Sequence, residues 1–336
     1  MASNTTWNEK TAGSEVAKAF ADQIKGRNVV ITGVAPNGIG QTTASAIASH
    51  GPAHLILASR TKEKLEKAAS ELRSTYPGVD IQTVILDLGA QASIRKAAVE
   101  ITAIIPKLDV LINNAGAVLM TRQLTAEGIE MQFGANHVGH FLFTKQLLPL
   151  LEAAARDGPE AGATRIINLS SQGHRCSPMR FHDYNIEGKE VPDEEKPPAL
   201  PPTFTRQNED GYLPIVAYGQ SKTANILFSL SLQQKLKSRG ITAFAVHPGS
   251  INTELSRDQD PEMAEAMSKT ANYWKTLDEG SAPTLVAALD PALNACNELF
   301  VSDCQVAEPM PWAKNLEFAE KLWKLSEELI GEKFEL

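Results

Sequence analysis

Short apolar runs alternate with longer segments of helical spacing along most of this chain. The runs are rich in Val, Ile and Leu, and they end near Thr32, Ala58, Leu86, Ile112, Leu169 and Val246. Most of the segments between them place apolar residues at the spacing of a helix. Strands that are apolar on both faces and alternate with helices indicate a parallel sheet covered on both sides. The pattern therefore predicts an α/β protein with a doubly wound parallel sheet, in a single domain over residues 1–336.

Three segments lie outside this alternation. Residues 1–25 are an N-terminal extension, within which residues 13–24 have the spacing of a short amphipathic helix. Residues 306–336 are a C-terminal tail, helical from about Trp312, and its apolar stripe predicts packing against the core or an interface. Residues 176–214 carry seven prolines, many acids and little apolar periodicity, which predicts an irregular insertion rather than a domain boundary. PxxP spacings in that segment could suit an SH3-type partner, but an irregular loop is the favoured interpretation.

Composition and charge exclude several classes of partner. Hydrophobic residues make up 43% and charged residues 21%, as in an ordinary folded domain. A net charge of −8 without a Lys/Arg cluster argues against nucleic acid. No apolar run approaches the ~20 residues that a membrane helix needs, and residues 1–27 lack the apolar core of a signal peptide. We therefore expect a soluble, cytoplasmic protein with no membrane partner.

The sequence also predicts no metal site. The three cysteines are too few and too scattered for a disulfide framework or a metal knuckle, which fits a reducing, intracellular setting. Five histidines show no metal-ligand spacing supported by carboxylates, which favours packed or surface positions for them. They are His137, His140, His174, His182 and His247.

A glycine-bearing turn follows the first predicted strand. Residues 29–32 are β-branched, residues 33–40 contain three glycines, and an Ala-rich helix follows. Glycines let the backbone approach a diphosphate, and free N–H groups at a helix start favour an anion. Plain βα turns also use glycine, so the later features of the chain decide the interpretation. The residues assigned to this phosphate site are Gly33, Asn37, Gly38, Ile39 and Gly40.

Polar residues follow the predicted strands one after another, where ligands of open parallel sheets bind. After the second strand come Ser59 and Arg60, where an NAD site would usually place an acid for the ribose 2′-hydroxyl. An arginine there favours a 2′-phosphate and hence NADP(H) over NAD(H), whereas the alternative for Arg60 is a solvated surface position. The other strand-end residues assigned to the cofactor are Asp87, Leu88, Asn114, Ala115, Gly116, Pro248, Gly249, Ile251 and Thr253.

The candidate chemistry lies in the segment AYGQSKTANILF. Tyr218 and Lys222 are four residues apart, so on a helix they share a face. A nearby ammonium favours the phenolate and should bring the tyrosine pKa down from ~10 toward working pH, which makes Tyr218 a usable general acid and base. The pair gains meaning from Ser171, which follows the fifth predicted strand, and from the glycine turn.

The order of these motifs resembles the short-chain dehydrogenase/reductase family. TG, GIG, NNAG, Asn136, SS, YxxxK and PG follow one another from about residue 26 to residue 305. The stretches NNAG, NLSSQGHR, AYGQSKTAN and FAVHPGSINTEL look most like the family's retinol-dehydrogenase-like and WW-domain-oxidoreductase-like branch. The resemblance implies a Rossmann fold and a catalytic set of Asn136, Ser171, Tyr218 and Lys222.

The same resemblance implies a role for each of these residues. Tyr218 would exchange a proton with the alcohol or carbonyl oxygen, and Ser171 would polarise that oxygen. Lys222 would lower the pKa of Tyr218 and hold the nicotinamide ribose, and Asn136 would complete a proton relay through water. Asp87 would contact the adenine and residues 114–116 its ribose. Ile251 and Thr253 would contact the carboxamide.

Two features depart from the family pattern. Four residues rather than three separate TG from GIG, although Pro36 and Asn37 make an extended turn plausible. The gap between Ser171 and Tyr218 is also long, so residues 176–214 must loop out and return. We expect this insertion to form a flap that shapes the substrate side of the active site.

We carry three functional hypotheses. The first is an NADP(H)-dependent oxidoreductase that interconverts an alcohol and its ketone or aldehyde, with reduction of a small lipophilic carbonyl substrate favoured. The second is a dinucleotide-binding sensor or scaffold without turnover, which has no need of the Ser171, Tyr218 and Lys222 set. The third, a methyltransferase, is disfavoured by Arg60 and by the Tyr/Lys pair. The resemblance implies that related chains commonly pair through the helices that hold Asn136 and Tyr218, and the apolar run ANILFSLSL suits either burial or a dimer seam, so a homodimer is one of two open alternatives.

Overall fold

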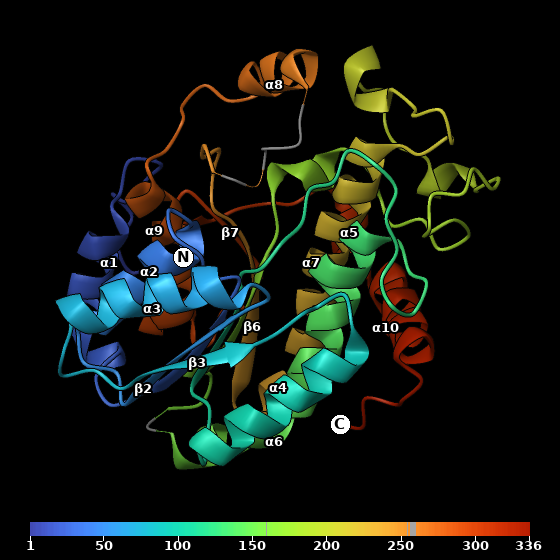
Figure 1. The fold of residues 1–336 in the computed structure, drawn as a ribbon. Coiled ribbons are helices and arrows are strands. Elements are labelled where there is room, and N and C mark those ends of the chain that lie inside the picture. Colours follow the sequence, from blue (N-terminus) through green and yellow to red (C-terminus); the bar gives the residue numbers. More distant parts are fainter. Residues whose placement is uncertain (159, 254, 256–259) are drawn as a thin grey trace.

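The structure, a computed structural model, describes residues 1–158, 160–253, 255 and 260–336. Its centre is an eight-stranded sheet in the order β3-β2-β1-β4-β5-β6-β7-β8 (Figure 1). All neighbouring strands are parallel except β7 and β8, which pair antiparallel. The strands are β1 (Asn28–Thr32), β2 (His54–Ser59), β3 (Ile81–Ile85), β4 (Val110–Asn113), β5 (Thr164–Leu169), β6 (Ile241–His247), β7 (Phe300–Ser302) and β8 (Gln305–Val306).

Helices cover both faces of this sheet, so the predicted doubly wound α/β fold is confirmed (Figure 1). The α-helices are α1 (Gly13–Ala19), α2 (Ile39–Ala48), α3 (Lys62–Thr75), α4 (Gln91–Ile104), α5 (Met131–Phe133), α6 (Gly139–Asp157), α7 (Pro214–Leu236), α8 (Pro261–Ser268), α9 (Leu277–Leu289) and α10 (Leu316–Ile330). A π-helical turn, η2 (Gly134–Val138), joins α5 to α6. Within the described ranges, no helix is both long and apolar enough to cross a membrane.

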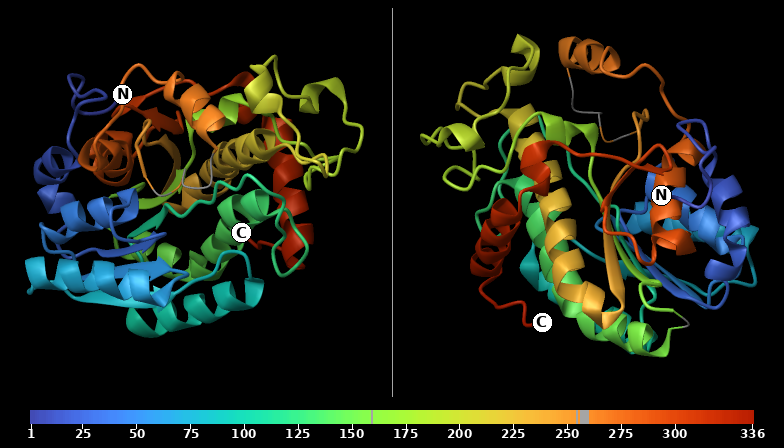
Figure 2. Two further views of the ribbon diagram at one scale, coloured as in Figure 1. Left: turned by 45° about the horizontal axis from the view of Figure 1, so that its top comes forward. Right: turned by 180° about the vertical axis from the view of Figure 1, so that it is seen from behind.

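Alternation along the strands divides the core into two layers. Val30 faces the layer that α4, α6, α7 and α10 build, whereas Val29 and Ile31 face the layer of α1, α2, α3 and α9. The two groups of helices lie on opposite sides of the sheet in Figure 2. Since the central strands are buried on both faces, their apolar runs show none of the polar alternation of a half-exposed sheet.

The C-terminal tail packs against α7 and α6, as its apolar stripe predicted. Ring stacking fixes it, with Phe334 centred 5.2 Å from Phe141 and 4.8 Å from Trp323. A hydrogen bond of 2.7 Å joins the ring of His137 to Ser326 in the middle of α10. The tail therefore covers part of α7 and the beginning of α6 with apolar and aromatic contacts.

A buried cation holds the end of α9 against the sheet. The Arg165 guanidinium is almost fully enclosed, and burial lowers its pKa to about 10. It donates to three backbone carbonyls and one side-chain amide, those of Gly162, Ala287, Asp290 and Asn294. Since the last carbonyls of a helix lack partners within the helix, Arg165 satisfies groups that would otherwise be buried unpaired.

Candidate active site

Helix α7 brings Tyr218 and Lys222 together, as their spacing predicted. The Lys222 ammonium lies over the Tyr218 ring, 5.6 Å from its centre, and donates to the carbonyl of Leu169 at 3.0 Å. Leu169 is the last residue of β5, so the lysine is anchored to the carboxyl end of the sheet. Lys222 is buried, whereas Tyr218 is only partly buried.

Ser171 lies beside Tyr218 although residues 176–214 separate them in the chain. It caps the short helix η3 (Gln172–Arg175), and its hydroxyl accepts the Gly173 amide at 3.0 Å. The same hydroxyl lies near the Tyr218 phenol, and its influence on the pKa of Tyr218 is to lower it. The two hydroxyls expected to share a substrate oxygen therefore meet, as the sequence predicted.

Two glycines allow η3 to pack directly on α7. A methyl group at Gly173 would lie 2.7 Å from one Tyr218 ring carbon and 2.8 Å from another. A methyl group at Gly219 would lie 2.9 Å from the Gly173 carbonyl. This close packing sets the distance between the Ser171 and Tyr218 hydroxyls.

We therefore expect Gly173→Ala to displace the Tyr218 ring and lower kcat by up to about 100-fold, because small displacements of a catalytic group are costly. Nucleotide affinity should change little, since Gly173 contacts none of the glycine turn. Gly78→Ala is the matched control, because a methyl group there meets nothing within 4 Å. Steady-state kinetics and a nucleotide titration of both variants test this, and an unchanged kcat in Gly173→Ala would contradict it.

The expected lowering of the Tyr218 pKa is wrong for this structure. Burial raises the pKa of Tyr218 to about 12, and the nearby Ser171 offsets only part of this. Burial also lowers the pKa of Lys222 to about 8. The physical reason is that the ammonium faces the ring rather than the hydroxyl and is itself desolvated. Tyr218 is therefore protonated at neutral pH.

Asn136 lies in the π-helical turn and ties two active-site segments together. Its side chain accepts the Ala117 amide at 2.7 Å and donates to the Ala117 carbonyl at 3.0 Å. It also donates to the Ser221 hydroxyl at 2.9 Å, which in turn donates to the Tyr218 carbonyl at 2.7 Å. Ser221, which the sequence did not single out, thus connects Asn136 to the catalytic helix.

The glycine turn has the conformation that a phosphate site needs. Gly33 has φ +73°, and a methyl group on it would lie 2.5 Å from the Cα of Ala115. A methyl group on Gly40 would lie 2.7 Å from the side-chain amide nitrogen of Asn114. Asn37 adopts φ +57°, so it accommodates the additional residue of the turn as expected. Gly38 precedes the first turn of α2, whose amides lack partners within the helix.

The remaining predicted cofactor residues also gather at the carboxyl edge of the sheet. Ile251 forms a parallel bridge with Lys275 after β6, and Asp87 accepts the Gly89 amide after β3. Arg60 is exposed after β2 and makes no hydrogen bond or ion pair with another described residue. Ser59, Leu88, Asn114, Gly116, Pro248, Gly249 and Thr253 lie at the ends of the same strands. The edge therefore offers glycines, a helix start, an acid and a free cation to a dinucleotide.

The insertion 176–214 packs beside this site as an ordered segment. Phe204 forms an apolar cluster with Ile215 of α7 and Met263 of α8. Arg206 pairs with Glu262 at 2.9 Å and also with Asp260. In Figure 2 the insertion and α8 lie side by side above the ends of the strands. The insertion thus packs against α7 and α8, although it contains only short 3₁₀ turns among its described elements.

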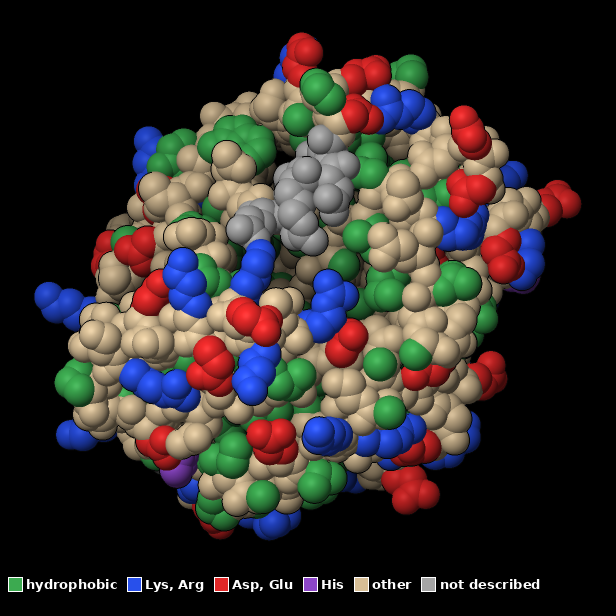
Figure 3. Space-filling view, viewed as in Figure 1, with side chains coloured by type: hydrophobic (Ala, Val, Ile, Leu, Met, Phe, Trp, Pro, Cys, Tyr) green, Lys and Arg blue, Asp and Glu red, His purple; other side chains and the backbone are tan. Residues whose placement is uncertain are grey.

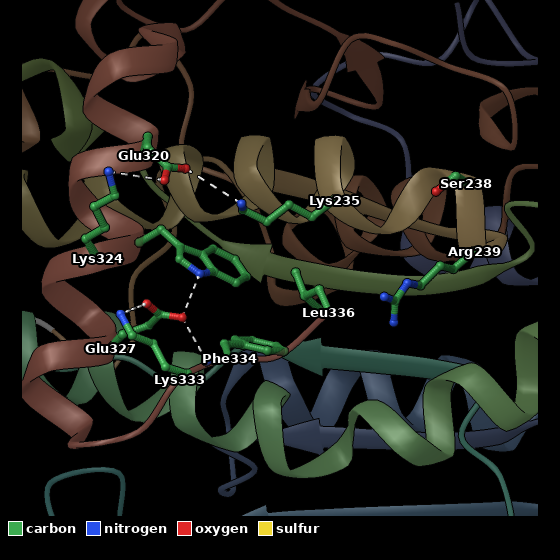
Figure 4. A pocket seen from close by; sticks show the side chains of 10 residues that line it. Lys235, Ser238, Arg239, Glu320, Lys324, Glu327, Lys333, Phe334 and Leu336 are labelled. Atoms are coloured by element: carbon green, nitrogen blue, oxygen red, sulfur yellow. Dashed lines mark hydrogen bonds and ion pairs between the residues drawn. The ribbon is translucent and has the colours of Figure 1, made fainter.

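A groove at the other end of α7 is not part of this site. It lies between α7, α10 and the C-terminal residues, and Figure 4 shows its Lys235 paired with Glu320 and its Lys333 with Glu327. Lys235 lies about 25 Å from Tyr218 along the axis of α7. Among the described residues, no cluster of His, Cys, Asp and Glu could hold a metal ion.

Comparisons with known proteins agree with this arrangement. A profile described as short chain dehydrogenase matches residues 27–185. Mouse retinol dehydrogenase 12 is 36% identical over 93% of this chain and 89% of its own. The oxidoreductase fscI of Fusarium equiseti is 39% identical over 71% of this chain and 93% of its own. An uncharacterised protein of Mycobacterium paratuberculosis of known structure is 31% identical, with a TM-score of 0.67 over 93% of this chain and 96% of that one.

Proposed function

We propose a specific reaction from the premise that this chain belongs to the short-chain dehydrogenase family, and is thus an oxidoreductase that acts on CH–OH groups with a nicotinamide dinucleotide. The reaction is the NADP(H)-dependent interconversion of a lipophilic ketone or aldehyde and its alcohol, with reduction favoured. One observation carries this proposal, the packing of the Ser171 segment directly against the Tyr218 ring, with the Lys222 ammonium on the same ring.

The two hydroxyls have complementary roles in reduction. Tyr218 and Ser171 both hydrogen-bond the substrate oxygen, and the phenol then donates its proton as negative charge develops there. Because burial holds the Tyr218 pKa at about 12, the phenol carries this proton throughout the neutral range. The raised pKa thus supports Tyr218 as an acid, which is the role that reduction requires.

The cofactor-holding residues are those of the carboxyl edge. The glycine turn and the start of α2 would bind the diphosphate, and Arg60 a 2′-phosphate. Lys222 would hold the nicotinamide ribose. When bound, the nicotinamide supplies or accepts the hydride, while the protein provides position and electrostatics.

An apolar cluster that the insertion and α8 form against α7 supports a lipophilic substrate. The cluster beside α7 is built from Met, Phe, Ile, Leu, Ala and Cys side chains, which are Met120, Cys176, Leu200, Phe204, Ile215, Met263, Ala266 and Met267. Met side chains adapt to irregular apolar shapes. The similarity to retinol dehydrogenase 12, whose name specifies a lipophilic alcohol, supports the same substrate class.

We propose a small molecule rather than nucleic acid as the partner of this site. On the face that Figure 3 shows, Lys and Arg side chains are interspersed with Asp and Glu side chains. A nucleic-acid site would require a continuous basic field, and the net charge of −8 also opposes one. The expected cytoplasmic location remains a proposal based on composition alone.

The test of cofactor choice is Arg60→Ala. We expect NADPH to bind more tightly than NADH, and the substitution to weaken NADPH binding about 10- to 100-fold, because a charge-assisted contact contributes roughly 1.5–3 kcal/mol. NADH affinity should stay unchanged, since NADH has no 2′-phosphate. Nucleotide fluorescence titrations measure both affinities.

Lys67→Ala is the matched control, since it removes the same charge from an exposed position in α3. It should leave NADPH affinity almost unchanged. Equal loss of NADPH affinity in both variants would assign the effect to general charge and contradict the role of Arg60. Failure of the wild type to bind either nucleotide would refute the oxidoreductase proposal itself.

A further inference from the structure

A buried histidine joins the two halves of the candidate active site. His140 lies in the first turn of α6, and Thr32 is the last residue of β1, directly before the glycine turn. The Nε2 atom of His140 is 2.9 Å from the Thr32 hydroxyl, and its Nδ1 atom is 2.9 Å from the Asn136 carbonyl. All three residues are enclosed.

The partners of this histidine determine which nitrogen carries the proton. The Asn136 carbonyl can only accept, so Nδ1 donates to it and the neutral ring accepts at Nε2. The Thr32 hydroxyl must then donate to Nε2, while it accepts the Ala115 amide at 3.0 Å. Burial lowers the pKa of His140 to about 4, in keeping with a neutral ring.

The chain of hydrogen bonds continues beyond Asn136 to the catalytic helix. The Asn136 side chain reaches both Ala117 and Ser221, and Ser221 reaches the Tyr218 carbonyl. These contacts connect the glycine turn, through His140 and Asn136, to the backbone carbonyl of Tyr218. At the glycine turn the series ends at the Ala115 amide, which cannot release its proton. The contacts therefore fix geometry and do not conduct protons.

We propose that His140 is a positioning residue, which sets the π-helical turn of Asn136, and through it the catalytic helix, relative to the glycine turn. The inference rests on the proposed function, since it assigns the catalytic step to Tyr218. It accounts for the change from α-helical to π-helical geometry at Asn136, because the ring of His140 holds the Asn136 carbonyl.

The first test reads the tautomer directly. Nitrogen NMR of labelled histidine should show His140 with a protonated Nδ1 and an unprotonated Nε2, and Thr32→Val should shift the Nε2 signal. A proton on Nε2 would overturn the proposal. This measurement needs no substrate and no nucleotide, so its outcome is independent of the proposed function.

The second test is a double-mutant cycle with NADPH and an aromatic aldehyde that the wild type reduces. His140→Phe should lower kcat about 10- to 100-fold and change the KM for NADPH much less. His140→Asn, which keeps a donor near Nδ1, should recover most of this loss. Thr32→Val removes the bonds to both His140 and the Ala115 amide, so the additional loss that His140→Phe causes should be much smaller in the Thr32→Val background than in the wild type. Additive losses of kcat in the double variant would contradict the proposed positioning role of His140.

The control for removing a buried histidine is His137→Phe. It breaks the hydrogen bond to Ser326 but leaves the hydrogen bond between His140 and Thr32 in place. It should lower the melting temperature more than kcat. An equal kcat loss in His137→Phe and His140→Phe would overturn the proposal. If Tyr218→Phe keeps full turnover, the proposed function fails, whereas loss in Tyr218→Phe with full kcat in His140→Phe refutes only the positioning role.

Discussion

Replacing Tyr218 with Phe is expected to lower turnover about 10²–10⁴-fold, the contribution typical of a general acid. The substitution removes only the hydroxyl and leaves the ring in place beneath Lys222 and against Gly173. NADPH affinity should therefore stay close to that of the wild type. Initial rates of NADPH oxidation with an aldehyde panel, together with a fluorescence titration, measure the two quantities separately.

Tyr76→Phe is the matched control for this experiment. Its hydroxyl is hydrogen-bonded to Ser45 at 3.0 Å, away from the carboxyl edge of the sheet, so the same atom is removed without touching the site. Turnover should persist in Tyr76→Phe. If Tyr218→Phe retains wild-type turnover while nucleotide still binds, the non-catalytic sensor or scaffold becomes the better description.

Replacing Arg165 with Met is expected to destabilise the protein by roughly 3–5 kcal/mol, because it leaves several buried acceptors without a donor. Met keeps much of the apolar stem, so the loss reports the guanidinium contacts with the end of α9 rather than a cavity. Urea unfolding followed by circular dichroism measures the change in the free energy of unfolding. The midpoint should fall with little change in the slope.

Arg156→Met provides the comparison for Arg165→Met, since Arg156 is exposed on α6. A surface substitution of this kind should cost no more than about 0.5 kcal/mol. A cost for Arg165→Met as small as that for Arg156→Met would mean that water or nearby side chains satisfy the freed carbonyls.

The strand ends could be predicted because central strands of a parallel sheet are apolar on both faces. The runs that end at Thr32 and Leu169 are uniformly buried in the structure, so the pattern and its cause agree. Strands β7 and β8 were missed. They are short, and the turn between them places Asp303 and Cys304 at positive φ, without the glycine that marks such turns.

Within the site, residue spacing predicted proximity but not electrostatics. Tyr218 and Lys222 share a helical face, as their separation requires, yet the Tyr218 pKa moves upward because burial outweighs the distant ammonium. The role of His140 could not be predicted either. Its partners are Thr32 of β1 and Asn136, and Asn136 lies in a turn whose π-helical geometry the sequence does not indicate.

The insertion was predicted from composition, but not the way in which it is held. Its proline and acid content indicated an irregular segment. The contacts that hold the segment in place, however, are made with residues far away in the sequence. Tyr212 donates to the enclosed carboxylate of Glu130 at 2.7 Å, and Arg122 pairs with Asp210 at 2.9 Å. Such long-range pairs leave no periodic trace in the sequence.

The docking of α10 has a consequence for assembly. Related chains are expected to pair through α6 and α7, but Phe141 of α6 and Phe228 of α7 already contact Trp323 of the same chain. Phe141 also contacts Phe334. A second copy could use this face only by competing with the tail, which is present at a high effective concentration because it is covalently attached. We therefore expect the docked tail to disfavour self-association through α6 and α7, so that a homodimer of the intact chain would use a different surface.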